Sequence, residues 1–160
     1  MYDPFKREIN YLRVSVTDLC NLRCAYCMPA GGVPKLPRKS ILTFEEIRNV
    51  VEVGARKGIS KVRLTGGEPL ARKGIVELVR MIANIEGIND FAMSTNGIFL
   101  DHYARELKEA GLHRVNISLD TLSPLHYKQI TRRGDINKVF AGIEAAQKVG
   151  LEPIKLNCVI

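Results

Sequence analysis

Three cysteines crowded into one short segment constrain this chain more than any other feature of its sequence. Cys20, Cys24 and Cys27 lie within residues 16–29, VTDLCNLRCAYCMP, at the spacing C-x3-C-x2-C. Thiolates at this spacing can ligate three corners of an iron–sulfur cubane, and no fourth cysteine lies nearby to take the last corner. One iron is then left open for chemistry. The segment therefore predicts a [4Fe-4S] cluster with a free coordination site.

Two other uses of the cysteines fit the sequence less well. A structural zinc site usually takes four ligands, and the three histidines, His102, His113 and His126, all lie far downstream of the cysteine segment. A disulfide framework is also disfavoured, because three of the four cysteines are crowded into eight positions. A cluster site is the better interpretation.

The composition indicates one folded unit. Hydrophobic residues make up 46% of the 160 residues, so residues 1–160 are expected to form a single domain around one core. No apolar run is long enough to span a bilayer, and residues 1–10, MYDPFKREIN, do not have the pattern of a secretion leader. We expect a cytoplasmic protein without a membrane partner, in a compartment where thiols stay reduced.

Strand and helix patterns alternate along the chain, which predicts βαβ units and a parallel sheet. Strands are predicted at residues 11–16, 60–64, 91–94, 114–119 and 152–160. Helices are predicted at about 44–57, at 75–82, through Tyr103 and Leu107 as far as Gly111, and through Val139, Ile143 and Ala146 to about Gly150. The first of these helices should begin with a capping box formed by Thr43 and Glu46.

Each predicted strand carries apolar residues on one face and small or polar residues on the other. A doubly wound sheet would be hydrophobic on both faces, so the alternation favours an α/β fold of the TIM-like barrel type, with five parallel strands and helices outside. The inward face would carry Arg13, Arg63 and Lys155, which indicates a cavity for an anionic ligand. The alternative is that these cations only pair with inward acids such as Glu68 or Asp120.

Other residues stand at the strand ends. Gly66 and Gly67 follow the second strand, where their backbone could approach a ligand or could form an ordinary connection. Cys158 shares the apolar face of the last strand and is expected to be a buried core residue. Arg132 and Arg133 are interpreted as solvated residues or residues of open function.

The motifs resemble those of known enzymes. Tyr26 before the third cysteine gives C-x3-C-x-aromatic-C, which resembles the signature of radical S-adenosylmethionine (SAM) enzymes. Six segments, in order, resemble the N-terminal half of the GTP 3′,8-cyclase family of molybdenum cofactor biosynthesis. They are YLRVSVTDLCNLRCAYCMP (11–29), KVRLTGGEPLARK (61–73), STNG (94–97), GLHRVNISLDTL (111–122), ITRRGD (130–135) and KLNCVI (155–160).

The resemblance implies a cofactor and a substrate. It implies that the open iron of a [4Fe-4S] cluster holds SAM together with Tyr26, Gly66, Gly67, Glu68 and Ser118. It implies GTP contacts from Arg13, Arg63, Ser94 and Lys155, with Ser94 keeping the hydroxyl of the threonine usual in the family. In the family a 5′-deoxyadenosyl radical removes hydrogen from C3′ of the GTP ribose, and the carbon radical attacks C8 of guanine. An electron donor for the cluster is also implied.

The chain departs from the family in one large respect. Family members carry a sixth barrel strand, a second cluster held by three more cysteines, and a Gly-Gly tail, and none of these occurs in the 160 residues. We therefore expect a radical SAM core truncated before the sixth strand, which binds SAM and the first cluster but shows weak or absent cyclase turnover.

Two other classes of protein stay open at this stage. A peptide-modifying radical SAM maturase would share the cysteine segment and the glycine turn but would not need Arg13, Arg63 and Lys155. A non-catalytic iron–sulfur or nucleic-acid-binding module would fit the net charge of +7. However, basic residues are interleaved with acids and aromatics are only 6%, so we expect no nucleic-acid partner. Monomer and homodimer are both compatible with the sequence.

Overall fold

A five-stranded parallel sheet organises the chain. The structure is a computed structural model that describes residues 2–34 and 37–159. The strands follow each other across the sheet in the order β1-β2-β3-β4-β5, and every neighbouring pair is parallel. Their bounds are β1 Tyr11–Ser15, β2 Lys61–Thr65, β3 Asp90–Thr95, β4 Arg114–Ser118 and β5 Lys155–Asn157.

Helices fill the connections between the strands, as the alternation predicted. The α-helices are α1 Phe44–Arg56, α2 Ile75–Ala83, α3 Leu100–Glu109, α4 Pro124–Thr131 and α5 Ile136–Lys148, and two short 3-10 turns are η1 Arg38–Ser40 and η2 Pro69–Ala71. The predicted capping box is present: Thr43 Oγ1 accepts from the Glu46 amide, and Glu46 accepts from the Thr43 amide. None of the described helices is long and apolar enough to cross a membrane.

Helix α4 is the one α-helix that the sequence did not predict. Ser123 accepts a hydrogen bond from the His126 amide and Pro124 stands at the first helical position, which is a common way for a helix to begin. Only Tyr127 and Thr131 of this helix are buried. With so few buried positions, the segment lacks the apolar periodicity that marks a longer helix.

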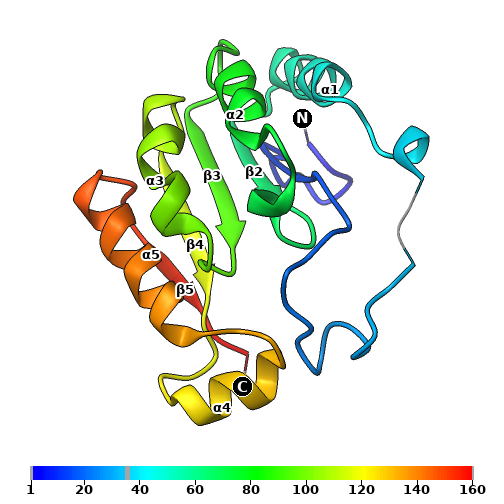
Figure 1. Cartoon of the computed structure of the whole chain (residues 1–160). Helices are drawn as coiled ribbons and strands as arrows, with labels where there is room; N and C mark the ends of the chain where they lie inside the picture. The colour runs from blue at the N-terminus through cyan, green and yellow to red at the C-terminus, as the bar shows by residue number, and fades with distance from the viewer. Residues whose placement is uncertain (1, 35–36, 160) are drawn as a thin grey trace.

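The two faces of the sheet differ as the alternation predicted for β1 to β4. Apolar side chains of β2, β3 and β4 are fully buried on one face, and α2, α3 and α5 lie along that face (Figure 1). The opposite face carries Arg13 beside Arg63, and Ser94 beside Asn116. No described helix of Figure 1 lies across this second face, which we call the open face, although Ala92 and Asn116 near its centre are buried.

The last strand is where the sequence prediction was wrong. A strand was expected over residues 152–160, but β5 comprises only Lys155–Asn157 and all three residues are exposed; Ile160 lies outside the described residues. Cys158 is exposed rather than buried, with its Sγ 3.3 Å from the Asp120 carbonyl oxygen, and Leu156 is 55% exposed. The physical reason is that β5 is an edge strand in the described chain, with no following element to cover its apolar side chains.

Two helical glycines should respond oppositely to the same substitution. Alanine is more favourable than glycine inside a helix by about 1 kcal/mol. At Gly54 of α1 an added Cβ would lie 3.4 Å from the Ile59 side chain, an ordinary contact, so Gly54→Ala should raise the free energy of unfolding. At Gly142 of α5 the Cβ would lie 2.4 Å from the Gly97 carbonyl oxygen, so Gly142→Ala should lower that free energy by about 1 to 3 kcal/mol.

Urea unfolding of the cluster-free protein, followed by circular dichroism, measures both changes under one set of conditions. An increase in stability with both substitutions would contradict the close approach of α5 to the turn after β3.

Candidate active site at the carboxyl end of the sheet

The cysteine segment leaves the carboxyl end of β1 and runs below the strands, where helix α4 also lies (Figure 1). Cys20 and Cys24 are half-buried, Cys27 is exposed, and all three thiols are free. Burial raises the pKa of the Cys20 thiol, and burial together with the charges of Cys20 and Cys27 raises the pKa of Cys24. The two half-buried thiols are therefore harder to ionise than an exposed cysteine.

The thiols fit a cluster better than a single metal ion. Among the described residues, no three His, Cys, Asp or Glu side chains converge as ligands of one ion. A cubane places each thiolate on a different iron, so its ligands stand farther apart than those of a zinc ion. Three free thiols in one loop, one of them exposed, are compatible with a [4Fe-4S] cluster that has one open corner, and their role as its ligands stays a prediction.

The glycine turn after β2 is packed directly against the cysteine segment. The Gly67 amide donates to the Thr17 carbonyl at 2.7 Å, and the Glu68 amide donates to the Leu19 carbonyl at 2.7 Å. A Cβ on Gly67 would lie 2.3 Å from the Leu19 carbonyl oxygen. Gly66, at φ +149°, would place one 2.5 Å from the Thr17 carbonyl oxygen. The two glycines are therefore required by the approach of the cysteine segment itself, whatever ligand they also contact.

Glu68 is a buried carboxylate that joins the glycine turn to the end of β3. It is 1% exposed and accepts hydrogen bonds from Thr95 Oγ1 at 2.8 Å, the Asn96 amide at 2.8 Å and the Leu70 amide at 3.1 Å. Burial raises the pKa of Glu68, and these three donors oppose the shift by stabilising the ionised form. In this structure Glu68 acts within the protein, and the sequence prediction that it contacts SAM stays a prediction.

Asn96 continues this network to the cysteine segment. Its side-chain amide donates to Asn21 Oδ1 at 2.8 Å and lies 4.0 Å from the Sγ of Cys20. The ends of β2 and β3 and the first cysteine are thus linked by a chain of polar contacts. The sequence offered Asn96 only as part of the STNG segment, without a role.

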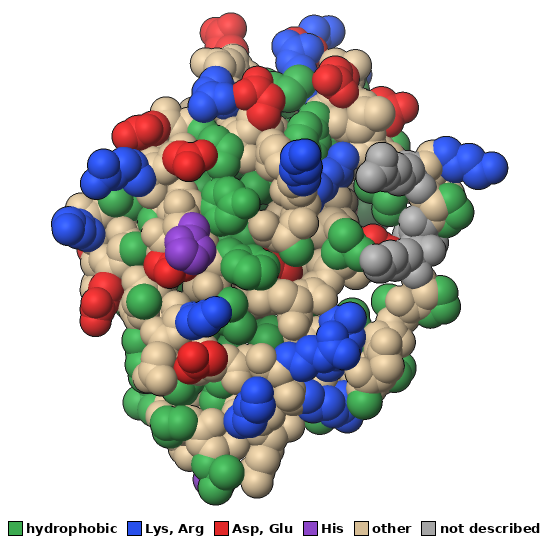
Figure 2. Space-filling view, viewed as in Figure 1, with side chains coloured by type: hydrophobic (Ala, Val, Ile, Leu, Met, Phe, Trp, Pro, Cys, Tyr) green, Lys and Arg blue, Asp and Glu red, His purple; other side chains and the backbone are tan. Residues whose placement is uncertain are grey.

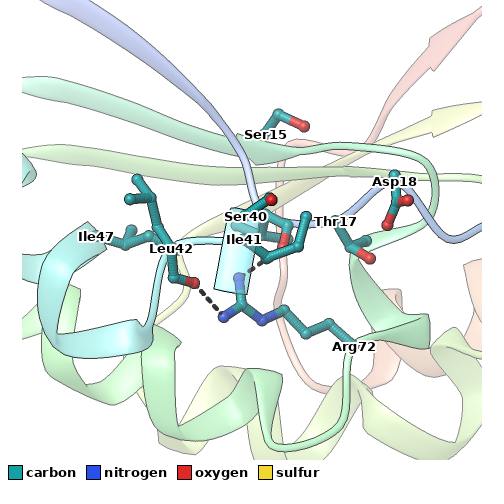
Figure 3. A pocket seen from close by; sticks show the side chains of 9 residues that line it. Ser15, Thr17, Asp18, Ser40, Ile41, Leu42, Ile47 and Arg72 are labelled. Carbon is teal, nitrogen blue, oxygen red and sulfur yellow. Dashed lines mark hydrogen bonds between the residues drawn. The ribbon is translucent and has the colours of Figure 1, made fainter. Parts of the chain in front are cut away.

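Arg72 contacts the start of the cysteine segment at Val16. Its guanidinium donates to the Val16 carbonyl and to the Leu42 carbonyl, each at 2.6 Å, and lies 4.3 Å from the centre of the Phe44 ring. Figure 3 shows both hydrogen bonds at the wall of a cavity of about 190 Å³, which Ser15 and Thr17 also line. Burial lowers the pKa of Arg72.

Tyr26 and Ser118 lie at the end of β4, although they come from distant parts of the sequence. The Tyr26 hydroxyl donates to Asp120 Oδ2 at 2.7 Å, and Asp120 Oδ1 accepts from the Val159 amide at 2.9 Å. Burial, followed by this hydrogen bond and the charge of Asp120, raises the pKa of Tyr26. Ser118 is exposed as the last residue of β4. The predicted SAM contacts Tyr26 and Ser118 are therefore brought to the same edge.

The open face of the sheet carries cations without acidic partners. Within the described part of the chain, Arg13, Arg63 and Lys155 make no hydrogen bond or ion pair, so the alternative pairing with Glu68 or Asp120 is not observed. The Nε atom of Arg63 is buried without a hydrogen-bond partner, and its guanidinium lies 5.4 Å from the centre of the Tyr11 ring.

Arg114, another cation of this face, which sequence reasoning missed, behaves differently. Arg114 forms a two-pronged ion pair with Asp90, at 3.0 and 2.7 Å, and also donates to Asn116 Oδ1 at 3.2 Å. The Arg114 side chain lowers the pKa of Asp90. The sequence could have indicated the position of Arg114, because it lies two residues before Asn116 in β4 and therefore on the same face of the sheet. Ser94 is half-buried on the same face, next to Asn116 in the register.

Sequence comparison gives the chain clear relatives. Residues 14–160 match the Radical SAM superfamily. The chain is 58% identical over 159 residues to the GTP 3′,8-cyclase of Alkaliphilus oremlandii, which covers 99% of this chain and 50% of that protein. It is 58% identical over 160 residues to the GTP 3′,8-cyclase of Moorella thermoacetica, covering 100% of this chain and 50% of that protein. The chain spans about half the length of the curated relatives it matches.

Solved structures share the fold at low sequence identity. HydG, a maturase of the [FeFe]-hydrogenase, is 18% identical with a TM-score of 0.75, covering 93% of this chain and 34% of that chain. SuiB of Streptococcus suis, bound to S-adenosylmethionine, is 16% identical with a TM-score of 0.71, covering 93% and 33%. The cysteine loop, the parallel sheet with its open polar face, and the superfamily match over most of the residues agree, and the chain belongs to the radical SAM superfamily.

Proposed function

We propose that residues 1–160 are the radical SAM core domain of a GTP 3′,8-cyclase, which binds a [4Fe-4S] cluster, SAM and GTP for the first step of molybdenum cofactor biosynthesis. The observation that carries this proposal is the open face of the sheet. Three cations of this face, Arg13, Arg63 and Lys155, have no acidic partner in the described chain. A triphosphate would supply the missing negative charge, and the names of the relatives supply the nucleotide.

The cofactor side of the proposal rests on the cysteine loop. Cys20, Cys24 and Cys27 would hold three irons, and the exposure of Cys27 leaves the cluster accessible on one side. When bound, the cluster supplies the electron that cleaves the sulfonium bond of SAM. That electron must come from an external donor, whose identity is left to experiment.

Four residues or turns would position SAM beside the cluster. The carbonyls of Gly66 and Gly67 accept no hydrogen bond within the described chain and are free to receive the amino group of SAM. Glu68 would hold this turn in place through its bonds to the end of β3. Tyr26 and Ser118 lie at the carboxyl end of β4 and would contact the nucleoside part.

The substrate would occupy the open face. Arg63 offers a guanidinium whose Nε is buried and unpaired, so a ligand oxygen at that position would relieve the cost of an unsatisfied donor. Arg13 lies beside it in the register, and Lys155 approaches from β5 on the far side of Asn116. Ser94, the register neighbour of Asn116, would add a hydroxyl contact.

The peptide-modifying alternative is supported less. The fold neighbours include the SAM-bound protein anSMEcpe with a peptide, at 23% identity, and this degree of likeness reports the fold only. A peptide substrate gives no reason for three unpaired cations on one face. Figure 2 shows acidic and basic side chains interleaved over the helices of the face in view, which also differs from a nucleic-acid-binding stripe.

The cluster ligands should be separable from the remaining cysteine. After anaerobic reconstitution, Cys158→Ala should keep about four irons per chain and an EPR signal that changes when SAM is added, because the proposal gives the cluster only Cys20, Cys24 and Cys27 as protein ligands. Replacing Cys20, Cys24 or Cys27 with Ala should abolish the SAM-dependent change. Loss of iron in Cys158→Ala would show that the cluster has a fourth protein ligand and no open iron.

The open face should bind GTP through its unpaired cations. Arg63→Ala and Lys155→Ala should each weaken GTP binding by about 10- to 100-fold, as expected when one charge-assisted hydrogen bond is lost. Isothermal titration calorimetry of the reconstituted protein with GTP, in the presence of SAM, measures the change in the dissociation constant.

Arg80→Ala is the matched control for the GTP titration. Arg80 lies on α2, pairs with Glu77 and is exposed, so its removal should leave the affinity for GTP unchanged. Equal weakening in Arg63→Ala and Arg80→Ala would indicate a general charge effect, and would reject the open face as the GTP site.

A further inference from the structure

The segment ITRRGD, residues 130–135, lies directly against the cysteine loop. The Arg23 amide donates to the Thr131 carbonyl at 3.1 Å, and the Ala25 amide donates to the Ile130 carbonyl at 2.9 Å. These two bonds join the end of α4 to the backbone on both sides of Cys24. Arg132 is exposed, as the sequence suggested, and its side chain also makes contacts whose role the sequence left open.

The Arg132 guanidinium closes the turn that contains two of the three cysteines. Its Nη1 donates to the Arg23 carbonyl at 2.9 Å and to the Met28 carbonyl at 2.9 Å. Between these two carbonyls, the Cys27 and Met28 amides both donate to the Cys24 carbonyl at 3.0 Å. The side chain thus bridges the residue before Cys24 and the residue after Cys27.

The backbone at Arg132 is fixed in an unusual conformation that aims this side chain. Its φ is +62°, which residues other than glycine rarely adopt. Its amide donates to the Lys128 carbonyl at 2.9 Å, and Thr131 Oγ1 accepts from the Gly134 amide at 3.0 Å. Gly134 is itself closely packed, because a Cβ there would lie 2.5 Å from the Tyr127 ring. Non-glycine residues in such conformations occur mostly where surrounding contacts require them.

Arg133, the next residue along the chain, differs from Arg132 in its contacts. Arg133 is also exposed and carries the same charge, yet it makes no hydrogen bond or ion pair with any described residue. In Figure 2 Lys and Arg side chains gather over the lower part of the view, where the cysteine loop and α4 lie in Figure 1. The charge is therefore shared by several residues, whereas the two hydrogen bonds to the cysteine loop belong to Arg132 alone among the basic residues of the ITRRGD segment.

We propose that Arg132 is a positioning residue for the cluster: it holds the Cys24–Cys27 turn in the shape that ligates iron, through the carbonyls of Arg23 and Met28. It acts through the loop backbone and does not touch the cluster ligands' sulfur atoms. The inference rests on the cluster-binding part of the proposed function and adds a residue outside the cysteine loop that cluster assembly depends on.

Hydrogen exchange of the cluster-free protein tests the contact without requiring a cluster. Arg132→Asn keeps a residue that tolerates positive φ but is too short to reach either carbonyl. It should speed amide exchange at Cys27 and Met28 by about tenfold or more, as expected for the loss of two hydrogen bonds. Arg133→Asn, the same substitution one residue later, should leave these amides unchanged. Amides of α2 and α5 report whether either variant is globally destabilised.

The reconstituted protein gives the second readout. Chelator-driven loss of iron should be about tenfold faster in Arg132→Asn than in wild type or Arg133→Asn, and Arg132→Lys should restore part of the retention because an ammonium can still donate to one carbonyl. Unchanged loop exchange in Arg132→Asn overturns the proposal, as does equal iron loss in Arg132→Asn and Arg133→Asn. Failure of wild type to take up iron would reject the cluster assignment instead, while the exchange result would still decide the role of Arg132 in the loop.

Discussion

The site depends on backbone hydrogen bonds that hold the cysteine loop against the turn after β2 and the end of α4. The Gly67 and Glu68 amides bind the Thr17 and Leu19 carbonyls, on the side of the sheet. The Arg23 amide binds the Thr131 carbonyl on the side of α4. A loop of this length without regular structure would otherwise leave its polar backbone to water and its three thiols without a fixed spacing. The fold supplies the partners that the loop lacks.

Charge pairing divides the open face of the sheet into two parts. Arg114 is neutralised by Asp90 near the amino end of the strands, where the ion pair stabilises β3 against β4. Arg63 and Lys155, on either side of this pair, have no such partner among the described residues. An arginine that merely stabilised the sheet would be expected to resemble Arg114. The contrast between paired and unpaired cations on one surface therefore says more about where an anionic ligand would bind than the net charge of the whole chain does.

Local sequence patterns predicted the features that neighbouring residues determine. They did not predict contacts between residues that are far apart in the sequence. The capping box of Thr43 and the strand alternation of β1 to β4 are short-range features and were confirmed. Arg72 reaches the Val16 carbonyl across 56 positions, and Arg132 reaches the Arg23 carbonyl across 109, so no window of sequence could reveal either contact. Cys158 was misplaced for a related reason: an apolar alternation predicts burial only where another element covers it.

The glycine turn shows why a lost activity would not identify a SAM contact. Gly67 is required because the Leu19 carbonyl approaches to within 2.3 Å of where its Cβ would stand. A side chain there would displace the cysteine loop before it met any ligand, so the cluster and the cofactor would be lost together. The same reasoning applies to Glu68, whose carboxylate holds Thr95 and the Asn96 amide inside the protein. Tyr26 and Ser118, the two exposed residues among the predicted SAM contacts, lie outside this packing, so substitutions there can separate an effect on binding from an effect on structure.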